Sequence, residues 1–340
     1  MSLGSGRRGG LGPLVNVVWR ALLLCAVAAG AIAAFKVLTV PSVGVNTRIA
    51  VVFKSTDPSI AFWQIVEAGV KAAAKEFEVR VSVVGPKEEK DTAGQIALVE
   101  RVIRERPQAI VLAADDYNAL VPAARSIRRA GIKLVTLDSG LPPGLSSSFI
   151  ATDNVAAGRK AGELEAQLLS PGSTVAILSY VQGTLTAIDR EKGVRDLLGA
   201  DAVIRVAGTW YCEDLLNEAY SITRRLLTSD RGITGIIALN EVATEGAAEA
   251  IADLKEAGRV ELVGFDSSPI ETTYLEAGVI KGIVLQKPFN MGYLAVKTAV
   301  ELLRGQPVPA RIDTGSAVIT RKNMDERENQ KLLFPLIGGQ

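Results

Sequence analysis

The chain repeats one pattern of strand and helix, four times in each of two consecutive halves. In the first half, apolar β-branched runs are spaced by 31, 30 and 24 residues and begin at Arg48, Val79, Ala109 and Lys133. In the second half the spacings are 30, 30 and 27 residues, and the runs begin at Ser173, Val203, Ile233 and Val260. Strands that alternate with helices at this spacing form βα units with right-handed crossovers. The sequence therefore predicts two similar, doubly wound parallel-sheet α/β domains with a ligand cleft between them.

The chain continues beyond the eighth run with pieces too few for a third domain. We expect a helix near 268–277, a strand near 281–285, a helix over 288–303 and two short strands in the tail. These pieces can complete the two sheets if the chain crosses between the domains several times. The sequence thus predicts a hinge made of several crossing strands.

Composition argues against most other classes of protein. The chain has 38 basic and 37 acidic side chains, so it lacks the charge of a nucleic-acid binder. It has no histidine, which removes the commonest general base and zinc ligand, and we expect neither an enzyme nor a metal or cofactor site. Its two cysteines, Cys25 and Cys212, do not provide a disulfide framework.

The N-terminus has the layout of an export signal. Arg7, Arg8 and Arg20 precede an uncharged stretch over 21–35, and no acidic residue occurs before Asp57. We therefore expect an extracytoplasmic protein. A cleaved signal peptide and a retained membrane anchor both fit, whereas Cys25 lacks the small preceding residue that a lipidation site requires.

Polar and aromatic side chains follow the predicted strands at the edge where open parallel sheets bind ligands. After strand one come Lys54, Ser55, Thr56, Asp57, Phe62 and Trp63, and Asp138 and Ser139 follow strand four. Four further positions follow strands of the second half: Arg190, Asn240, Asp266 and Gln286. Carboxylate, guanidinium and amide groups together suit sugar hydroxyls, and aromatic rings, including those of Trp210 and Tyr211, can stack on a sugar. We predict a ligand site made of Phe62, Trp63, Asp138, Arg190, Asn240, Asp266 and Gln286.

Each of these residues also has a simpler interpretation. Asp138 and Asp266 lie at strand-to-helix turns, where an aspartate is often only a helix N-cap. Arg190 could be a solvated surface charge, and Phe62 and Trp63 also belong to the apolar face of the first helix. The recurrence of polar groups at equivalent positions in both halves favours the ligand site.

From about Arg48 to Ile319 the chain resembles ribose-binding-protein-type (type I) periplasmic sugar-binding proteins, the receptors of ABC sugar importers. The resemblance rests on the order and spacing of seven motifs: K-S-T-D-P-S-I-A-F-W, V-T-L-D-S-G, I-A-T-D-N-V-A-A-G, Q-G-T-L-T-A-I-D-R-E-K-G, L-N-E-V-A-T-E-G-A, V-G-F-D-S-S-P and V-L-Q-K-P-F-N-M-G. It implies the same ligand residues, with Asp153 and Asn154 as capping and hinge residues. Two departures stand out: Ser139 occupies the place of a frequent sugar-binding arginine, and 210–213 occupies that of an expected aromatic contact.

The resemblance also implies a division of the chain and a set of partners. Residues 1–47 are expected to be a signal or membrane anchor plus linker, 48–152 and 287–312 the N-terminal lobe, and 153–286 and 313–330 the C-terminal lobe. The partners implied are a small neutral sugar and the permease subunits of an ABC importer, with the protein a monomer that touches the membrane only through an uncleaved N-terminus. A sugar-sensing module that signals to a membrane sensor kinase is the alternative. A repressor effector domain shares the fold, but the export segment argues against it.

Overall fold

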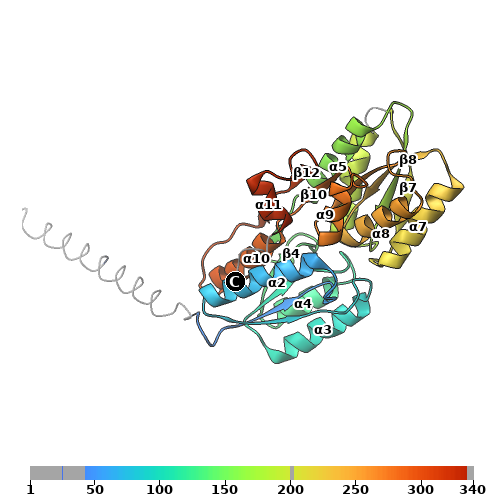
Figure 1. The fold of residues 1–340 in the computed structure, drawn as a ribbon. Helices are drawn as coiled ribbons and strands as arrows, with labels where there is room; N and C mark the ends of the chain where they lie inside the picture. Colours follow the sequence, from blue (N-terminus) through green and yellow to red (C-terminus); the bar gives the residue numbers. More distant parts are fainter. Residues whose placement is uncertain (1–24, 26–42, 200–202, 335–340) are drawn as a thin grey trace, which may run out of the picture. The chain divides into compact units, whose positions relative to one another are not determined.

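The computed structural model describes residues 25, 43–199 and 203–334, and 43–334 contain two α/β lobes (Figure 1). The sheet of the first lobe contains β1 (Arg48–Val52), β2 (Arg80–Val84), β3 (Ala109–Leu112), β4 (Lys133–Leu137), β5 (Ser148–Ala151) and β11 (Arg311–Asp313). The sheet of the second lobe contains β6 (Thr174–Ser179), β7 (Arg205–Tyr211), β8 (Ile233–Ala238), β9 (Glu261–Phe265), β10 (Gly282–Leu285) and β12 (Ala317–Thr320).

The two sheets have equivalent strand orders, β11-β5-β4-β3-β1-β2 and β12-β10-β9-β8-β6-β7. Nine of the ten strand pairings are parallel, and only β12 runs antiparallel to its neighbour β10. In each sheet the order reverses next to its first strand, which is where open α/β sheets bind ligands. The predicted fold class, two doubly wound parallel-sheet domains, is confirmed.

Ten helices pack on these sheets in the described part of the chain. The first lobe has α2 (Ala61–Glu76), α3 (Thr92–Glu105), α4 (Val121–Arg129) and α10 (Pro288–Leu303). The second has α5 (Asn154–Leu168), α6 (Leu185–Leu198), α7 (Leu216–Ser229), α8 (Glu241–Asp253), α9 (Pro269–Glu276) and α11 (Arg327–Leu333).

The strands are apolar throughout because both faces of each sheet are covered. In β1, Ile49 and Val51 belong to the core under α2 and α10, while Ala50 and Val52 belong to the core under α3 and α4. Burial of both sets fixes the register of β1, since a slip by one residue would exchange the two cores.

Close helix pairs fix the position of the cleft-facing elements. A Cβ on Gly69 of α2 would lie 2.0 Å from the carbonyl oxygen of Phe289 in α10, so only glycine permits this approach. The second lobe has an equivalent close contact between helices, since a Cβ on Gly158 of α5 would lie 2.1 Å from the carbonyl oxygen of Arg190 in α6. The backbone of Arg190 is therefore held by a helix contact that requires glycine.

Three segments cross between the lobes, at β5–α5, β10–α10 and β11–β12. The backbone N–H of Asp153 donates to the carboxylate of Asp313 at 3.0 Å, and the N–H of Thr314 donates to the carbonyl of Ala151 at 3.0 Å. The predicted multi-strand hinge is therefore present, and the predicted lobe boundaries stay a prediction. Asp153 caps α5 as expected, with its side chain accepting from the N–H of Ala156.

Some predictions differ from the structure or fall outside it. Strand β5 was not predicted because it follows β4 through a loop with no helix between them, so it falls outside the repeat of strand and helix. Helix α11 was not predicted because seven residues are too short for a helical period to stand out. The predicted signal or anchor lies, except for Cys25 and the residues from 43 on, outside the described residues. Among the helices that the structure describes, none has the length and apolarity to cross a membrane.

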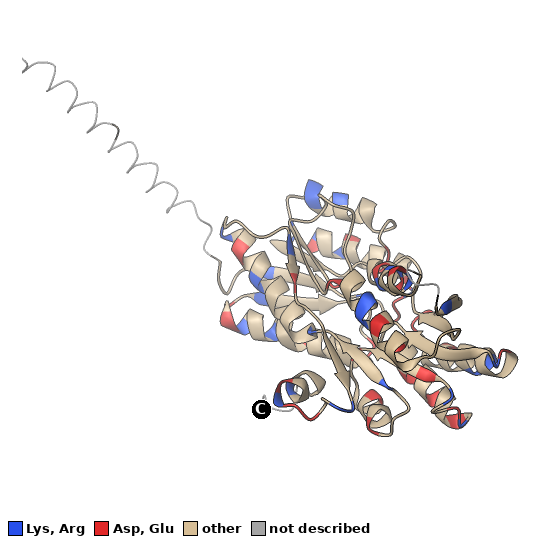
Figure 2. Cartoon of the chain, turned by 90° about the horizontal axis from the view of Figure 1, so that it is seen from above, with Lys and Arg blue, Asp and Glu red and all other residues tan. Residues whose placement is uncertain are grey.

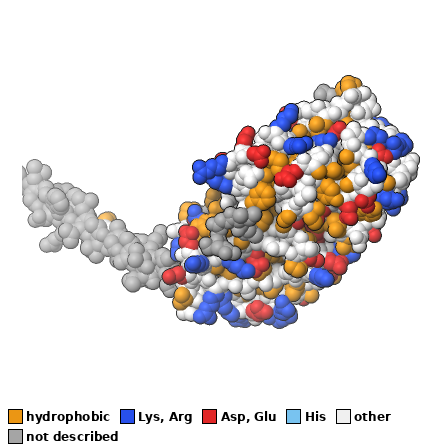
Figure 3. Space-filling view, in the orientation of Figure 1, with side chains coloured by type: hydrophobic (Ala, Val, Ile, Leu, Met, Phe, Trp, Pro, Cys, Tyr) orange, Lys and Arg blue, Asp and Glu red, His pale blue; other side chains and the backbone are white. Residues whose placement is uncertain are grey.

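The surface carries charges of both signs. On the face shown in Figure 3, Lys and Arg side chains are interspersed with Asp and Glu. This mixture agrees with the near balance of 38 basic and 37 acidic residues in the sequence.

Candidate ligand-binding site

A small cavity lies between the lobes, at the carboxyl ends of strands from both sheets. Its lining includes all seven residues predicted from the sequence: Phe62, Trp63, Asp138, Arg190, Asn240, Asp266 and Gln286. The lining also includes seven residues that were not in the predicted set: Lys54, Ile60, Glu89, Tyr180, Thr186, Asp214 and Glu241. The cavity leaves about 30 Å³ of space for water, whereas pockets for small molecules span about 300–1,000 Å³. A sugar can therefore enter only when the lobes separate or side chains move aside.

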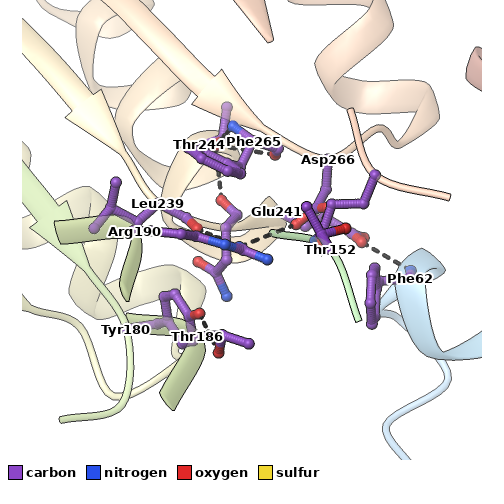
Figure 4. A network of polar contacts seen from close by, with 12 residues as sticks. Phe62, Thr152, Tyr180, Thr186, Arg190, Leu239, Glu241, Thr244, Phe265 and Asp266 are labelled. Carbon is purple, nitrogen blue, oxygen red and sulfur yellow. Dashed lines mark hydrogen bonds and ion pairs between the residues drawn. The ribbon is translucent and has the colours of Figure 1, made fainter. Parts of the chain in front are cut away.

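Arg190 anchors the second-lobe wall of the cavity (Figure 4). It is 2 % exposed, and its Nε donates to Oδ1 of Asn154 at 2.8 Å while Nη1 donates to the carbonyl of Leu239 at 2.6 Å. The guanidinium lies 4.6 Å from the ring centre of Phe265. A solvated surface charge is excluded, and Asn154, at the start of α5 where the chain crosses between the lobes, orients the guanidinium, while the cap of that helix is Asp153.

Asp266 and Gln286 form the adjoining acceptor corner. Gln286 Nε2 donates to Asp266 Oδ1 at 2.7 Å, and Arg190 Nη1 lies 3.9 Å from Asp266 Oδ2. Burial raises the pKa of the Asp266 carboxyl, although Arg190 and Gln286 oppose that rise. Gln286 Oε1 is buried without a hydrogen-bond partner among the described residues, so an acceptor remains for a ligand hydroxyl.

Lys54 is the cation of the first-lobe wall. Its Nζ lies 3.2 Å from Glu89 Oε2 and 3.2 Å from Asp138 Oδ2, and all three side chains are buried. Burial lowers the pKa of Lys54, but the charges of Asp138 and Glu89 outweigh burial and raise it above its ordinary value. Lys54 is therefore an ammonium donor in the first-lobe wall. Ser139, the next residue after Asp138, accepts from the N–H of Leu185 across the lobes at 3.3 Å.

Aromatic rings surround the ammonium group. Phe62 and Trp63 meet edge to face with ring centres 5.1 Å apart, and Trp63 Nε1 donates to Glu89 Oε1 at 3.1 Å. Lys54 Nζ lies 5.6 Å from the ring centre of Trp63 and 5.5 Å from that of Tyr180. The rings of Phe62 and Trp63 belong to the first-lobe core and also line the cavity, so their place on the apolar face of the helix is confirmed and their role in ligand binding stays a prediction.

Glu241 joins the two lobes directly. It is the first residue of α8 in the second lobe, and its carboxylate accepts from the backbone N–H of Ala61 at 2.8 Å and of Phe62 at 2.9 Å in the first lobe (Figure 4). Helix α2 has Ile60 at its N-cap, with no side-chain hydrogen bond of its own. The second lobe thus supplies the cap that α2 lacks. Burial raises the pKa of Glu241 to about 8, although these two hydrogen bonds oppose the rise.

Asn240 and Asp214 close the remaining side. Asn240 caps α8 by accepting from the N–H of Ala243, and its Nδ2 donates to Asp214 Oδ1 at 2.6 Å. Asp214 follows Glu213 in a turn where both residues have positive φ, 57° and 53°. Burial raises the pKa of Asp214 to about 8, with the charge of Glu89 acting in the same direction.

The structure decides between several of the alternatives left by the sequence. Asp138 and Asp266 are not N-caps of any helix in the described residues, and both have positive φ, 57° and 71°, which turns their carboxylates toward the cavity. Trp210 and Tyr211 do not line the cavity, and Tyr211 donates instead to Glu191 at 2.9 Å. The cavity receives its second-lobe aromatic ring from Tyr180.

Most of the residues missing from the prediction obey the same strand-end rule. Lys54 and Tyr180 directly follow the apolar runs of β1 and β6, and Glu89 lies in the loop after β2. Asp214 lies three residues after β7 and required knowledge of where that strand ends. No local signal marks Glu241, because its partners are 179 and 180 residues away.

Comparison with known proteins gives the chain a clear set of relatives. Residues 49–307 match the family model of the periplasmic binding protein domain. A D-ribose/D-allose-binding protein of Pseudomonas aeruginosa is 30 % identical over 270 residues, which cover 76 % of this chain and 83 % of that protein.

Solved structures agree with these relatives. An ABC transporter solute-binding protein from Agrobacterium vitis with bound D-fucose has a TM-score of 0.81 and 31 % identity, covering 84 % of this chain and 99 % of that one. A sugar transporter from Clostridium phytofermentans has a TM-score of 0.75 and 36 % identity, covering 81 % and 98 %. These are binding and transport proteins, so the predictions of a sugar receptor, of an extracytoplasmic location and of a non-enzyme are confirmed at this level.

Proposed function

The chain belongs to the periplasmic binding protein family, and we propose that it binds one small neutral carbohydrate between its lobes, closes on it and delivers it to an ABC importer. The observation that carries this proposal is the convergence of hydroxyl-binding side chains from both lobes on one cavity. Donors and acceptors from both sides allow a ligand to bridge the lobes, which is how ligand binding can favour the closed form.

The chemistry of the cavity supports a polyhydroxylated ligand. Asp138 and Asp266 accept, Arg190 and Lys54 donate, and Gln286 does both. Rings of Phe62, Trp63 and Tyr180 supply apolar surface for the faces of a sugar ring. Relatives named for D-ribose, D-allose and D-fucose provide the first ligands to test.

The contacts between the lobes support closure. Glu241 caps α2 across the cleft, and the backbone N–H of Tyr117 donates to the carbonyl of Gly183 in the other lobe at 2.9 Å. With about 30 Å³ of free space, the described form is closed. Opening must break these contacts, and a bound sugar adds new ones that offset that loss.

A thermal-shift screen of D-ribose, D-allose, D-fucose and D-arabinose tests the binding proposal. We expect at least one sugar to raise the melting temperature, and Asp266→Ala and Arg190→Ala to weaken its binding by at least about 30-fold, from about 2 kcal/mol for a lost charge-assisted hydrogen bond. Gln286→Ala, which removes an uncharged side chain, gives a second reading if a charge variant misfolds. Arg195→Ala is the matched control, because Arg195 lies on α6 but pairs with Glu191 on the surface.

Delivery to an importer needs a separate measurement. We expect the sugar-loaded protein to stimulate ATP hydrolysis by its permease in proteoliposomes more than the sugar-free protein does. Binding variants that retain their fold should lose this stimulation in proportion to their lost affinity. Equal stimulation with and without sugar would refute delivery while leaving sugar binding intact.

A further inference from the structure

A second cavity lies at the other end of the first sheet. It is a groove of about 710 Å³, lined in part by Arg104, Arg106, Arg129 and Lys133, and we call it the basal groove. Lys133 begins β4, Arg104 and Arg106 end α3, and Arg129 ends α4. The basal groove therefore lies at the starts of the strands, whereas the sugar cavity lies at their carboxyl ends.

The basal groove is strongly cationic. Arg104, Arg106, Arg129 and Lys133 are exposed, and none of them forms an ion pair within the part of the chain that the structure describes. Figure 2 colours the ribbon blue at Lys and Arg residues. The nearest acidic residue in sequence, Glu105, lies 3.9 Å from Arg101 instead.

The positive charge extends along the same edge of the sheet. Arg48 and Arg80 begin β1 and β2, are paired across these strands and are exposed. Arg48 Nη2 also donates to the carbonyl of Arg106 at 3.0 Å, which ties this edge to the rim of the groove. Helix C-termini favour basic residues and account for those on α3 and α4, but not for Arg48, Arg80 and Lys133 at strand starts.

The equivalent base of the second lobe is different. There Arg231 and Arg259 both pair with Glu256, and Lys281 pairs with Glu261 at 3.4 Å. The two sheets have equivalent strand orders, so a basic surface at the strand starts is not a consequence of the fold. In the second lobe only Arg205, at the start of β7, is a strand-start cation without an ion pair among the described residues, whereas the first lobe gathers several such cations around one groove.

The chain also enters the first lobe at this end. Residues 21–35 are uncharged and follow three arginines, and twelve residues lie between Phe35 and Arg48. A fully extended stretch of that length spans at most about 45 Å. If residues 21–35 bind a bilayer, this length limits how far Arg48 can lie from its surface.

We propose that the basal groove binds the anionic head groups of phospholipids and holds the base of the first lobe against the membrane. Arginine and lysine at a shared concave surface recognise phosphate oxygens through charge-assisted hydrogen bonds. Each basic residue near an anionic bilayer strengthens binding about fivefold. The sugar cavity lies at the opposite end of the sheet, away from the proposed membrane contact, and the proposal stands independently of the sugar.

The test compares the full chain with the triple variant Arg104→Gln, Arg129→Gln and Lys133→Gln. The matched control, Arg225→Gln, Arg321→Gln and Lys322→Gln, neutralises three exposed cations of the second lobe. Each protein is mixed with vesicles of phosphatidylcholine alone or with one third phosphatidylglycerol. Hydrogen exchange at 103–108 and 129–133 is then measured, since this readout reports the groove whatever the N-terminus does.

On anionic vesicles at physiological ionic strength, we expect the wild type and the control to exchange at least fivefold more slowly at these segments. The groove variant should show no slowing, and high salt should abolish the effect in all proteins. Equal slowing on phosphatidylcholine, or slowing in the groove variant, overturns the proposal. The same slowing with inorganic phosphate alone assigns the groove to free phosphate and also overturns membrane docking. An unchanged thermal shift with sugar shows that the groove variant is folded.

Discussion

The contact between Glu241 and helix α2 makes the sharpest prediction, because one side chain of the second lobe completes a helix of the first. In the closed form the carboxylate accepts from the N–H groups of Ala61 and Phe62 at 2.8 and 2.9 Å. The variant Glu241→Ala removes both acceptors and leaves α2 without a side-chain cap, since Ile60 provides none.

The expected loss of sugar affinity follows from the hydrogen bonds that the closed and the open form each lose in Glu241→Ala. Replacing a capping side chain by alanine costs about 1–2 kcal/mol where the cap is buried. In the open form water can bond the same N–H groups, so the loss falls on the closed form alone. A closure penalty of this size lowers sugar affinity about 5–30-fold, because binding is linked to closure. Glu241→Gln retains one acceptor oxygen and should lie between the wild type and alanine.

Two measurements on one set of variants check this reasoning. Titration calorimetry with a sugar found by thermal shift gives the affinity, and small-angle X-ray scattering without sugar gives the shift toward the open form. Glu245→Ala is the control, because Glu245 lies one turn along α8 and bonds Ser268 within its own lobe. If Glu241→Ala binds sugar as tightly as the control and scatters identically, the cap plays no part in closure.

Three further predictions concern stability. Lys54→Met leaves two buried carboxylates without their ammonium partner and should destabilise the fold by about 3–5 kcal/mol, measured by chemical unfolding. Burial raises the pKa of Asp214 to about 8, so the sugar-free protein should lose stability as pH rises from about 4 through 8. Asp214 contributes at most about 1.4 kcal/mol per pH unit to this loss, and Asp214→Asn should remove that contribution in thermal unfolding scans between pH 5 and 8. Gly69→Ala places a Cβ 2.0 Å from the carbonyl oxygen of Phe289 and should cost about 1–3 kcal/mol, seen as a lower melting temperature.

The fold could be predicted from the sequence because its determinants are local. Apolar runs such as 109–112 are buried on both faces, and a helix such as 288–303 has a long amphipathic pattern. The type and the order of these strands and helices could therefore be read from the sequence. Strand β5 was missed because it follows a loop rich in glycine, proline and serine, with no helix between it and β4. It is as long as β3 but begins with a serine, whereas β3 is apolar throughout.

The sequence predicts those cavity residues that directly follow a strand, because this position can be read for each sheet without knowing how the two lobes meet. Asp138 and Asp266 were identified in this way, and the positive φ of both residues, which turns them into the cavity, could not be read from residue type. Trp210 and Tyr211, named as possible stacking partners of a sugar, do not reach the cavity because β7 extends through both residues. The turn that reaches the cavity begins only after them. An error of three residues in a strand end was enough to replace Asp214 by an aromatic pair.

What remained beyond prediction are the contacts that exist only when the lobes meet. Each lobe alone gives Glu241 the role of a first-turn acidic residue on α8, and gives α2 a poor N-terminus. The acidic first turn of α8 does not indicate the missing cap of α2, or the reverse, because residues 61 and 241 are 180 positions apart in the sequence. The defect in α2 is nevertheless visible in the sequence, because an isoleucine stands where a capping residue is preferred. An uncapped helix start is not enough by itself, since α7 and α10 also begin beside the cavity without a side-chain cap, so the partner of α2 becomes visible only when both lobes are in place.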